Sequence, residues 1–152
     1  SNSIRGGDTE DTAVVLLKFD NGSVGTLSVS DTILSPWSWE LTSKENSIYP
    51  NQKQNCYWIG GTHGSMELPQ SKIWKSTEKR SWWEPLTHTN NKVDETKNHP
   101  LNEQLDNFLA VIKKKQEPVC SGLDGLNTLA VIEAIKLAAK RGAAVKPEIL
   151  TD

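Results

Sequence analysis

The sequence predicts an α+β fold: a mainly antiparallel β-sheet with C-terminal helices packed on one face and the other face available for dimerisation. Three observations predict it. The first thirty residues hold a strand–turn–strand pattern, the apolar period changes from 2 to 3.6 after Pro100, and the last helix is apolar nearly all round. A chain of 152 residues is long enough for one domain with a sizeable core.

The first element is a β-hairpin over residues 12–29, centred on Asn21-Gly22. Asn-Gly favours a two-residue type I′ loop, in which Gly22 takes φ > 0. With that loop Phe19 faces Val24, and each face of the hairpin carries apolar side chains. One face would hold Val15, Leu17, Phe19 and Val24, and the other Val14, Leu16, Leu27 and Val29.

A second pair of strands is expected at residues 56–59 and 65–68, followed by a strand near residues 72–75. The glycine-rich stretch 60–64 joins the pair. It lacks the G-x-G-x-x-G spacing between a strand and a helix that binds a dinucleotide, so we interpret it as a tight bulged hairpin turn. Segments 31–55 and 76–100 are expected as long loops, a length typical of functional or mobile connections.

Two helices close the sequence. Apolar residues at helical spacing predict the first from Leu101 to about Lys115. The second is predicted from Leu123 to Arg141, with Ser121 or Asp124 as N-cap and Gly142 at the left-handed C′ position. Its sheet-facing side is expected to hold Leu126, Ala130, Ala134, Leu137 and Ala138. Two helices can cover only one sheet face, so another domain or a second copy should cover the other.

Composition excludes several classes of function. The net charge of −2, from 17 basic and 19 acidic residues, predicts neither nucleic acid nor a membrane surface as a partner. Two distant cysteines, Cys56 and Cys120, suit a reducing compartment, and the chain is expected to be cytoplasmic. The three histidines lack metal-ligand spacing, and no nucleophile motif is present, so neither a metal site nor a catalytic residue is predicted.

Candidate substrate-binding residues come from the six tryptophans. Trp37 and Trp39 alternate, so an extended backbone would place both on one face, next to Glu40. Aromatic rings beside a carboxylate suit a sugar or polyol, although tryptophans also fill cores and interfaces. Arg5 is a further candidate.

The chain resembles the C-terminal half of the glucose-fructose oxidoreductase/inositol dehydrogenase family (Gfo/Idh/MocA). The resemblance lies in the residues and the order of four stretches, at 10–25, 59–65, 99–108 and 121–126. The resemblance implies that residues 1–152 form a single C-terminal α/β substrate and dimerisation domain. It also implies an N-terminal Rossmann domain upstream of residue 1, which would carry the NAD or NADP site and the catalytic residues. No residue of this chain is then expected to bind the cofactor, and the chain alone should be inactive.

The resemblance favours an NAD(P)-dependent oxidoreductase acting on a sugar or polyol. In such an enzyme this domain would form one wall of the substrate pocket and would make a homodimer through its sheet face. Two alternatives from other classes stay open. The tryptophans and the β-rich middle would permit a stand-alone carbohydrate-binding module, and the uncovered sheet face would permit a homo-association module. A long helix that is apolar nearly all round speaks against the binding module.

Overall fold

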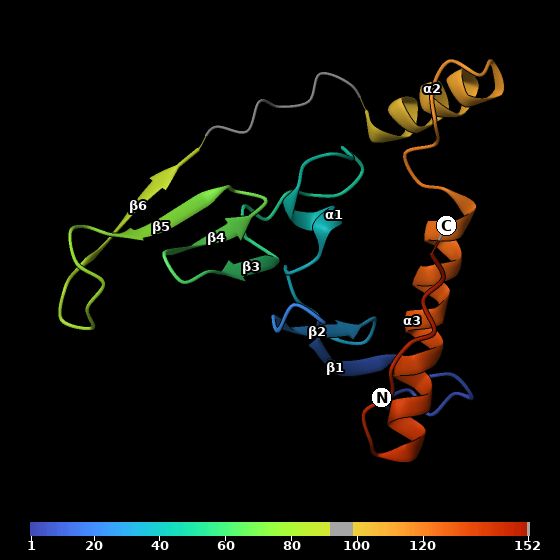
Figure 1. Cartoon of the computed structure of the whole chain (residues 1–152), viewed down its shortest axis with the longest axis horizontal. Coiled ribbons are helices and arrows are strands. Elements are labelled where there is room, and N and C mark those ends of the chain that lie inside the picture. Colours follow the sequence, from blue (N-terminus) through green and yellow to red (C-terminus); the bar gives the residue numbers. More distant parts are fainter. Residues whose placement is uncertain (92–98, 152) are drawn as a thin grey trace. The chain divides into compact units, whose positions relative to one another are not determined.

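A computed structural model describes residues 1–91 and 99–151. The chain divides into two compact units, which are described separately: unit 1 is Ser1–Leu34 with Ala110–Asp152, and unit 2 is Ser35–Leu109. Both units combine strands with helices, and every strand pair is antiparallel (Figure 1). The α+β class, with antiparallel sheets and C-terminal helices, is confirmed. The strands form two sheets, one of two strands and one of four.

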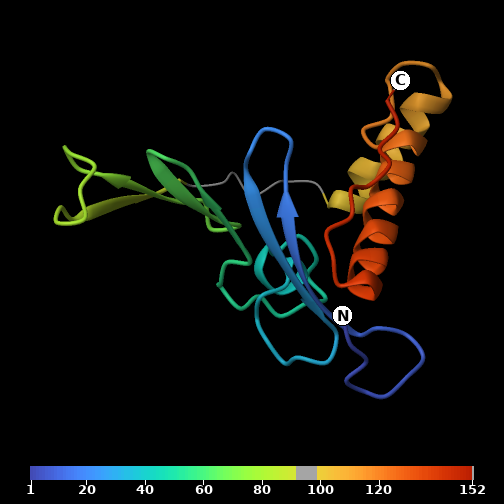
Figure 2. The ribbon, with the colours of Figure 1, turned by 60° about the horizontal axis from the view of Figure 1, so that its bottom comes forward.

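Unit 1 begins with a hairpin of β1 (Thr12–Lys18) and β2 (Val24–Ser30), shown side by side in Figure 2. Gly22 has φ of 85°, which confirms the predicted left-handed glycine. The loop is longer than predicted, because Gly22 N–H donates to the Phe19 carbonyl and Phe19 N–H to the Ser23 carbonyl. Phe19 therefore opposes Ser23 around a three-residue loop, the type I turn with a left-handed third residue.

This loop shifts the strand pairing by one residue from the predicted register. Lys18 pairs with Val24 and Val15 with Leu27, so the predicted pairing of Phe19 with Val24 is wrong. Since side chains alternate, the shift moves every β2 residue to the opposite face from the one predicted. One face now holds Ala13, Val15, Leu17, Leu27 and Val29, and the other holds Val14, Leu16 and Val24 among Thr12, Lys18, Thr26, Ser28 and Ser30.

The last helix, α3 (Gly122–Arg141), starts one residue before the predicted Leu123 and ends at the predicted Arg141. The Ser121 hydroxyl accepts from Asp124 N–H, and the Asp124 carboxylate accepts from Ser121 N–H, which makes a capping box. Gly142 ends the helix with φ of 63°, a left-handed conformation in which glycine avoids the Cβ clash. The other long helix, α2 (Pro100–Ile112), stops three residues before the expected Lys115.

The C-terminal tail folds back along α3. The Asn127 side chain both donates to the Leu150 carbonyl, at 2.9 Å, and accepts from Leu150 N–H, at 2.8 Å. Ala134, the one buried apolar residue among the described residues, lies on the α3 face beside this tail. The apolar residues of this helix predict a sheet against this face, but within unit 1 the C-terminal tail lies there.

Unit 2 contains a four-stranded sheet in the order β3 (Tyr57–Gly60), β4 (Gly64–Leu68), β5 (Lys72–Ser76) and β6 (Leu86–Asn90). The predicted strands at 56–59, 65–68 and 72–75 are confirmed within one residue at each end. The stretch 60–64 is a hairpin turn, as predicted, because Gly61 N–H donates to the Gly64 carbonyl at 2.8 Å.

Two elements lie in segments that were predicted to be loops. The strand β6 pairs with β5 along five residues, although its Leu-Thr-His-Thr-Asn sequence has almost no apolar alternation. The short helix α1 (Trp39–Thr42) is capped by Ser38, whose hydroxyl accepts from Leu41 N–H. Both elements are too short, or too polar, for periodicity to reveal them.

Candidate functional site

One face of the four-stranded sheet gathers aromatic and polar side chains. Strand alternation and register place two cross-strand rows on this face. One row runs Trp58–Glu67–Lys72–Asn90, and the other runs Gly60–Ser65–Trp74–His88. The opposite face is more apolar and holds Tyr57, Ile59, Met66, Leu68 and Ile73.

Glu67 is the centre of the polar face. One carboxylate oxygen accepts from the Trp74 indole N–H at 2.6 Å, and the other accepts from the Asn55 amide at 2.8 Å. The Asn55 amide oxygen in turn accepts from Gln70 N–H at 2.9 Å, which fixes the amide orientation and points its NH₂ group at Glu67. The carboxylate is therefore held from both sides.

These bonds also set the charge of Glu67. The indole N–H of Trp74 is the largest cause that lowers the pKa of this carboxyl, and the Asn55 amide and the positive charge of Lys72 act in the same direction. Partial desolvation, the second-largest effect, raises the pKa, and the lowering effects together outweigh it. Glu67 is consequently an ionised, preorganised acceptor.

The Trp74 ring contacts two further polar side chains, Lys72 and His88. The Lys72 ammonium lies 4.1 Å from the centroid of the Trp74 ring system, within cation–π range. The His88 ring lies 4.7 Å from the Trp74 ring, tilted by 45°. Trp74 is thus fixed by contacts on its ring and on its N–H group, and it cannot turn without breaking the bond to Glu67.

A hollow of about 390 Å³ opens beside Trp74 on this face. Its volume is within the range of small-ligand sites, roughly 300–1,000 Å³. Gly60, which has no side chain, and Ser65, which has a small one, lie in the same row as Trp74 and belong to the lining. The lining comprises Trp58, Ile59, Gly60, Ser65, Met66, Glu67, Trp74 and Leu86. We call it the Trp58–Trp74 hollow.

Gly64 lets the strands approach closely enough to form this face. A Cβ atom on Gly64 would lie 2.6 Å from the Trp74 carbonyl oxygen, closer than real Cβ atoms come to such a group. Gly60, at the other end of the same turn, has nothing within 4 Å of its Cβ position. The β4–β5 spacing beside Trp74 therefore depends on one glycine and not on the other.

The predicted pair Trp37 and Trp39 does not lie on one extended strand, because α1 starts at Trp39. The Trp39 ring packs on Tyr57 with centroids 5.7 Å apart, and its N–H donates to Glu45 at 2.6 Å. Tyr57 belongs to the apolar sheet face, so Trp39 packs on the side opposite the Trp58–Trp74 hollow. Trp37 is 62% exposed, and Glu40 is exposed in the first turn of α1.

Arg5, the fourth predicted residue, lies in unit 1 and is held by two acidic residues. Its guanidinium contacts the Asp31 carboxylate at 2.5 Å and the Asp31 carbonyl at 3.0 Å. Its backbone N–H donates to Asp11 at 2.9 Å, and this bond is the largest cause that lowers the pKa of Asp11. Both contacts fasten the N-terminal segment to the hairpin of unit 1.

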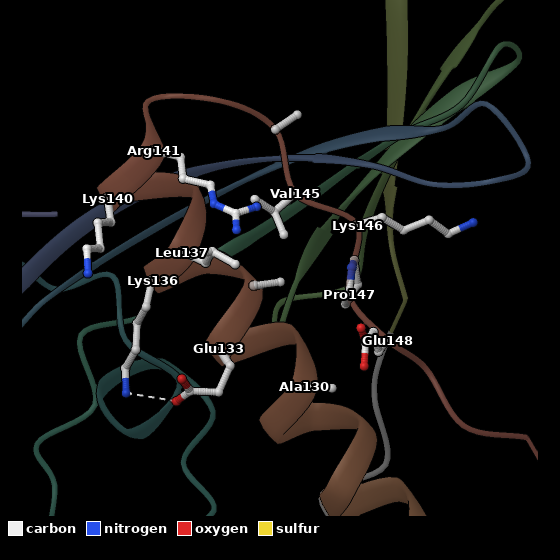
Figure 3. A pocket seen from close by; sticks show the side chains of 12 residues that line it. Ala130, Glu133, Lys136, Leu137, Lys140, Arg141, Val145, Lys146, Pro147 and Glu148 are labelled. Atoms are coloured by element: carbon white, nitrogen blue, oxygen red, sulfur yellow. Dashed lines mark hydrogen bonds and ion pairs between the residues drawn. The ribbon is translucent and has the colours of Figure 1, made fainter.

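A larger groove, of about 840 Å³, lies between α3 and the C-terminal tail (Figure 3). Its cations do not converge on one point. Figure 3 shows Lys140 and Lys146 pointing away from each other, and Lys136 is bound to Glu133 at 3.0 Å. The groove separates a helix from its own tail and gathers no set of polar groups around a common centre.

The described residues form no other site with recognisable chemistry. Nowhere in residues 1–91 and 99–151 do three or more His, Cys, Asp or Glu side chains gather as metal ligands. In the same residues, no helix has the length and apolarity required to cross a membrane.

Comparison with known families gives one match. Residues 1–146 match the Gfo/Idh/MocA family described as the oxidoreductase family, C-terminal alpha/beta domain. The chain belongs to this family. The resemblance stated from the sequence is thereby confirmed over nearly the whole chain. Neither a curated protein nor a solved structure gave a match.

Sequence reasoning missed the main residues of the hollow in this oxidoreductase-family domain. The strands of Trp58, Glu67 and Trp74 were predicted, and a two-residue turn at Thr62-His63 would have paired Trp58 with Glu67. That pairing was a usable signal. His88 gave no such signal, because its strand was not predicted.

Proposed function

We propose that this domain forms one wall of the substrate pocket of an NAD(P)-dependent oxidoreductase that acts on a sugar or polyol. Family membership supplies the reaction class, and the Trp58–Trp74 hollow carries the proposal for the substrate. Aromatic faces suit the C–H faces of a sugar ring, and an ionised carboxylate accepts hydrogen bonds from hydroxyl groups. A cytoplasmic location, where Cys56 and Cys120 would stay reduced, is part of the same proposal.

The described residues do not fit a dinucleotide. The glycine-rich stretch Gly60–Gly64 joins two antiparallel strands, whereas a pyrophosphate is bound where a glycine-rich turn leads from a strand into a helix. We therefore assign no cofactor contact to this chain. In the proposal, NAD or NADP is held by another domain and supplies the hydride chemistry.

The four residues selected from the sequence stay proposals as substrate-binding residues, with less support than the Trp58–Trp74 hollow. Trp37 and Glu40 are exposed and could approach a substrate, whereas the Trp39 ring is occupied by Tyr57 and the Arg5 guanidinium by Asp31. The Trp58–Trp74 hollow differs from these four residues because it combines aromatic rings, a fixed carboxylate and free volume on one sheet face.

The experiment is steady-state NAD(P) reduction by the full-length protein with a panel of sugars and polyols. Trp58→Ala removes one wall of the hollow and should lower kcat/KM about tenfold or more. Trp82→Ala is the matched control, because Trp82 is fully exposed in the turn between β5 and β6 of the same sheet. Equal kinetics for wild type and Trp58→Ala with every active substrate would remove the hollow from the pocket.

We propose a second role, homodimerisation through a sheet face, which is supported by one specific observation. Val14, Leu16 and Val24 share one face of the β1–β2 hairpin and are 70%, 84% and 79% exposed. Apolar residues gathered on an uncovered strand face are typical of an interaction surface. Stable dimers bury roughly 2,000 Å² or more, so this row would be the centre of a wider contact.

Sedimentation equilibrium tests the second role. Leu16→Lys places a charge in the exposed row and should shift the full-length protein toward monomer. Leu34→Lys is the control, because Leu34 is fully exposed but lies outside the strands. A dimer unaffected by Leu16→Lys, or a wild-type protein that stays monomeric at high concentration, would contradict the assignment.

A further inference from the structure

The Trp58–Trp74 hollow has a defined donor and acceptor character. Of its eight lining residues, Glu67 is the one with a formal charge. Its two oxygens each hold one structural hydrogen bond, from Trp74 and from Asn55. An ionised carboxylate offers about four acceptor positions and no donor, so about two remain for a ligand.

A ligand group placed against Glu67 must therefore be a hydrogen-bond donor. Hydroxyl and ammonium groups are donors, whereas ionised phosphate and carboxylate groups are acceptors that carry the same sign of charge as Glu67. Glu67 cannot easily adapt by turning away, because Trp74 and the Asn55–Gln70 pair hold it on both sides. The hydrogen bonds of the sheet residues therefore keep a negatively charged acceptor in the lining, where an anionic ligand group would be repelled.

We propose that the hollow selects neutral or amino-bearing sugars and polyols, and that it rejects those which present a phosphate or carboxylate group to Glu67. This inference rests on the proposed function and adds the charge class of the substrate to it. An ammonium group placed against Glu67 gains a charge-assisted bond, a hydroxyl group gains an ordinary hydrogen bond, and an ionised phosphate or carboxylate group gains neither.

Lys72 is the cation that could reverse this preference, since it stands beside Glu67 on the adjacent strand. Its ammonium lies over the Trp74 ring, 4.1 Å from the centroid, and Lys72 is not among the lining residues. The charged group in the lining of the hollow is therefore the Glu67 carboxylate and not the Lys72 ammonium. This lining favours rejection of an anion over its capture.

The test is a calorimetric titration of the full-length protein without cofactor. Glucose, galactose and mannose are each compared with the corresponding 6-phosphate, uronic acid and 2-amino sugar. We expect the anionic forms to bind at least tenfold more weakly than the neutral sugars, and the amino forms to bind as well or better. Glu67→Gln should narrow the difference between neutral and anionic forms, whereas Glu84→Gln, which removes an exposed carboxylate outside the hollow, should leave it unchanged.

The outcomes are separable from those of the proposed function. If 6-phosphates or uronic acids bind the wild-type protein as tightly as the neutral sugars, the inference is overturned. Loss of that binding in Lys72→Gln would then identify Lys72 as the group that binds the anion. If none of these sugars binds, it is overturned as well. If neutral sugars bind selectively but none reduces NAD(P), the proposed reaction fails while the charge selectivity stands. The wild-type comparison decides the inference even if Glu67→Gln does not fold.

Discussion

Gly64→Ala should destabilise the four-stranded sheet, whereas Gly60→Ala should not. The added methyl group of Gly64→Ala would stand 2.6 Å from the Trp74 carbonyl oxygen, inside the 3.0 Å that real Cβ atoms keep from such groups. The obstacle is backbone, so β4 and β5 must separate by at least about 0.4 Å. Such a movement would disturb the backbone bonds that link the two strands.

The expected loss can be worked out from two opposing effects. Overpacking of this kind costs roughly 1–3 kcal/mol. Replacing glycine with alanine also restricts the unfolded chain, which returns about 0.4–1 kcal/mol. The difference spans about 0–2.6 kcal/mol, and we expect a net loss near its middle, about 1–2 kcal/mol. Gly60→Ala has only the second effect, because nothing lies within 4 Å of its Cβ position.

Urea unfolding, followed by tryptophan fluorescence, measures both variants. With a slope of about 2 kcal/mol per molar urea, the middle of the usual range for small proteins, the midpoint of Gly64→Ala should fall by about 0.5–1 M. The midpoint of Gly60→Ala should stay level or rise. Equal midpoints in the two variants would refute the reasoning, because the close approach of β4 to Trp74 would then have no energetic effect.

Four further predictions concern unit 1. Gly22→Val forces a β-branched residue to φ of 85° and should lower the free energy of unfolding, measured by thermal unfolding, by about 1 kcal/mol or more. Gly125→Ala, in an open position of α3, should raise the free energy of unfolding by up to about 1 kcal/mol. Ser121→Ala removes the N-cap and should cost about 1 kcal/mol, with lower helical circular dichroism. The hydrogen bonds from Ser121 lower the pKa of Asp124 below its usual 3.8. The stability that Asp124 contributes is therefore complete above pH 3.8 and is lost as the pH falls through the lower pKa of the folded state. Asp124→Asn should remove this acid-dependent loss of helix. Leu137→Asp places a charge on the half-buried α3 face beside the tail and should lower the melting temperature, and an unchanged melting temperature would contradict that packing.

The fold was predictable where a local chemical signal determines it. The N-cap of α3 was narrowed to Ser121 or Asp124, and its terminal glycine was identified as Gly142, because caps depend on neighbouring residues alone. In the structure Ser121 is the N-cap, and Asp124 completes a capping box with it. The left-handed Gly22 was predicted for the same reason. The loop around it was not, because Asn-Gly fits both a two-residue loop and the last two positions of a three-residue loop.

The candidate site was harder to predict because it depends on pairings between strands. Trp37 and Trp39 were selected for their spacing, but the Ser38 cap starts a helix between them. Trp58, Glu67 and Trp74 are separated by seven residues or more along the chain and meet only through the register of the sheet. Their chemistry was visible in the sequence, but their proximity was not.

The three-residue loop of the first hairpin has a consequence for related proteins. Phe19 and Ser23 close this loop, and this pair sets which β2 side chains join the half-buried face of β1. If the strands closed with Asp20 opposite Ser23 instead, Val24 would join that face, and Leu27 and Val29 would move to the other one. Deleting one residue inside the loop keeps Phe19 opposite Ser23 and therefore keeps the alternation. Related proteins are thus expected to differ in the length of this loop without a change in the apolar pattern of the second strand, as long as the closing pair stays the same.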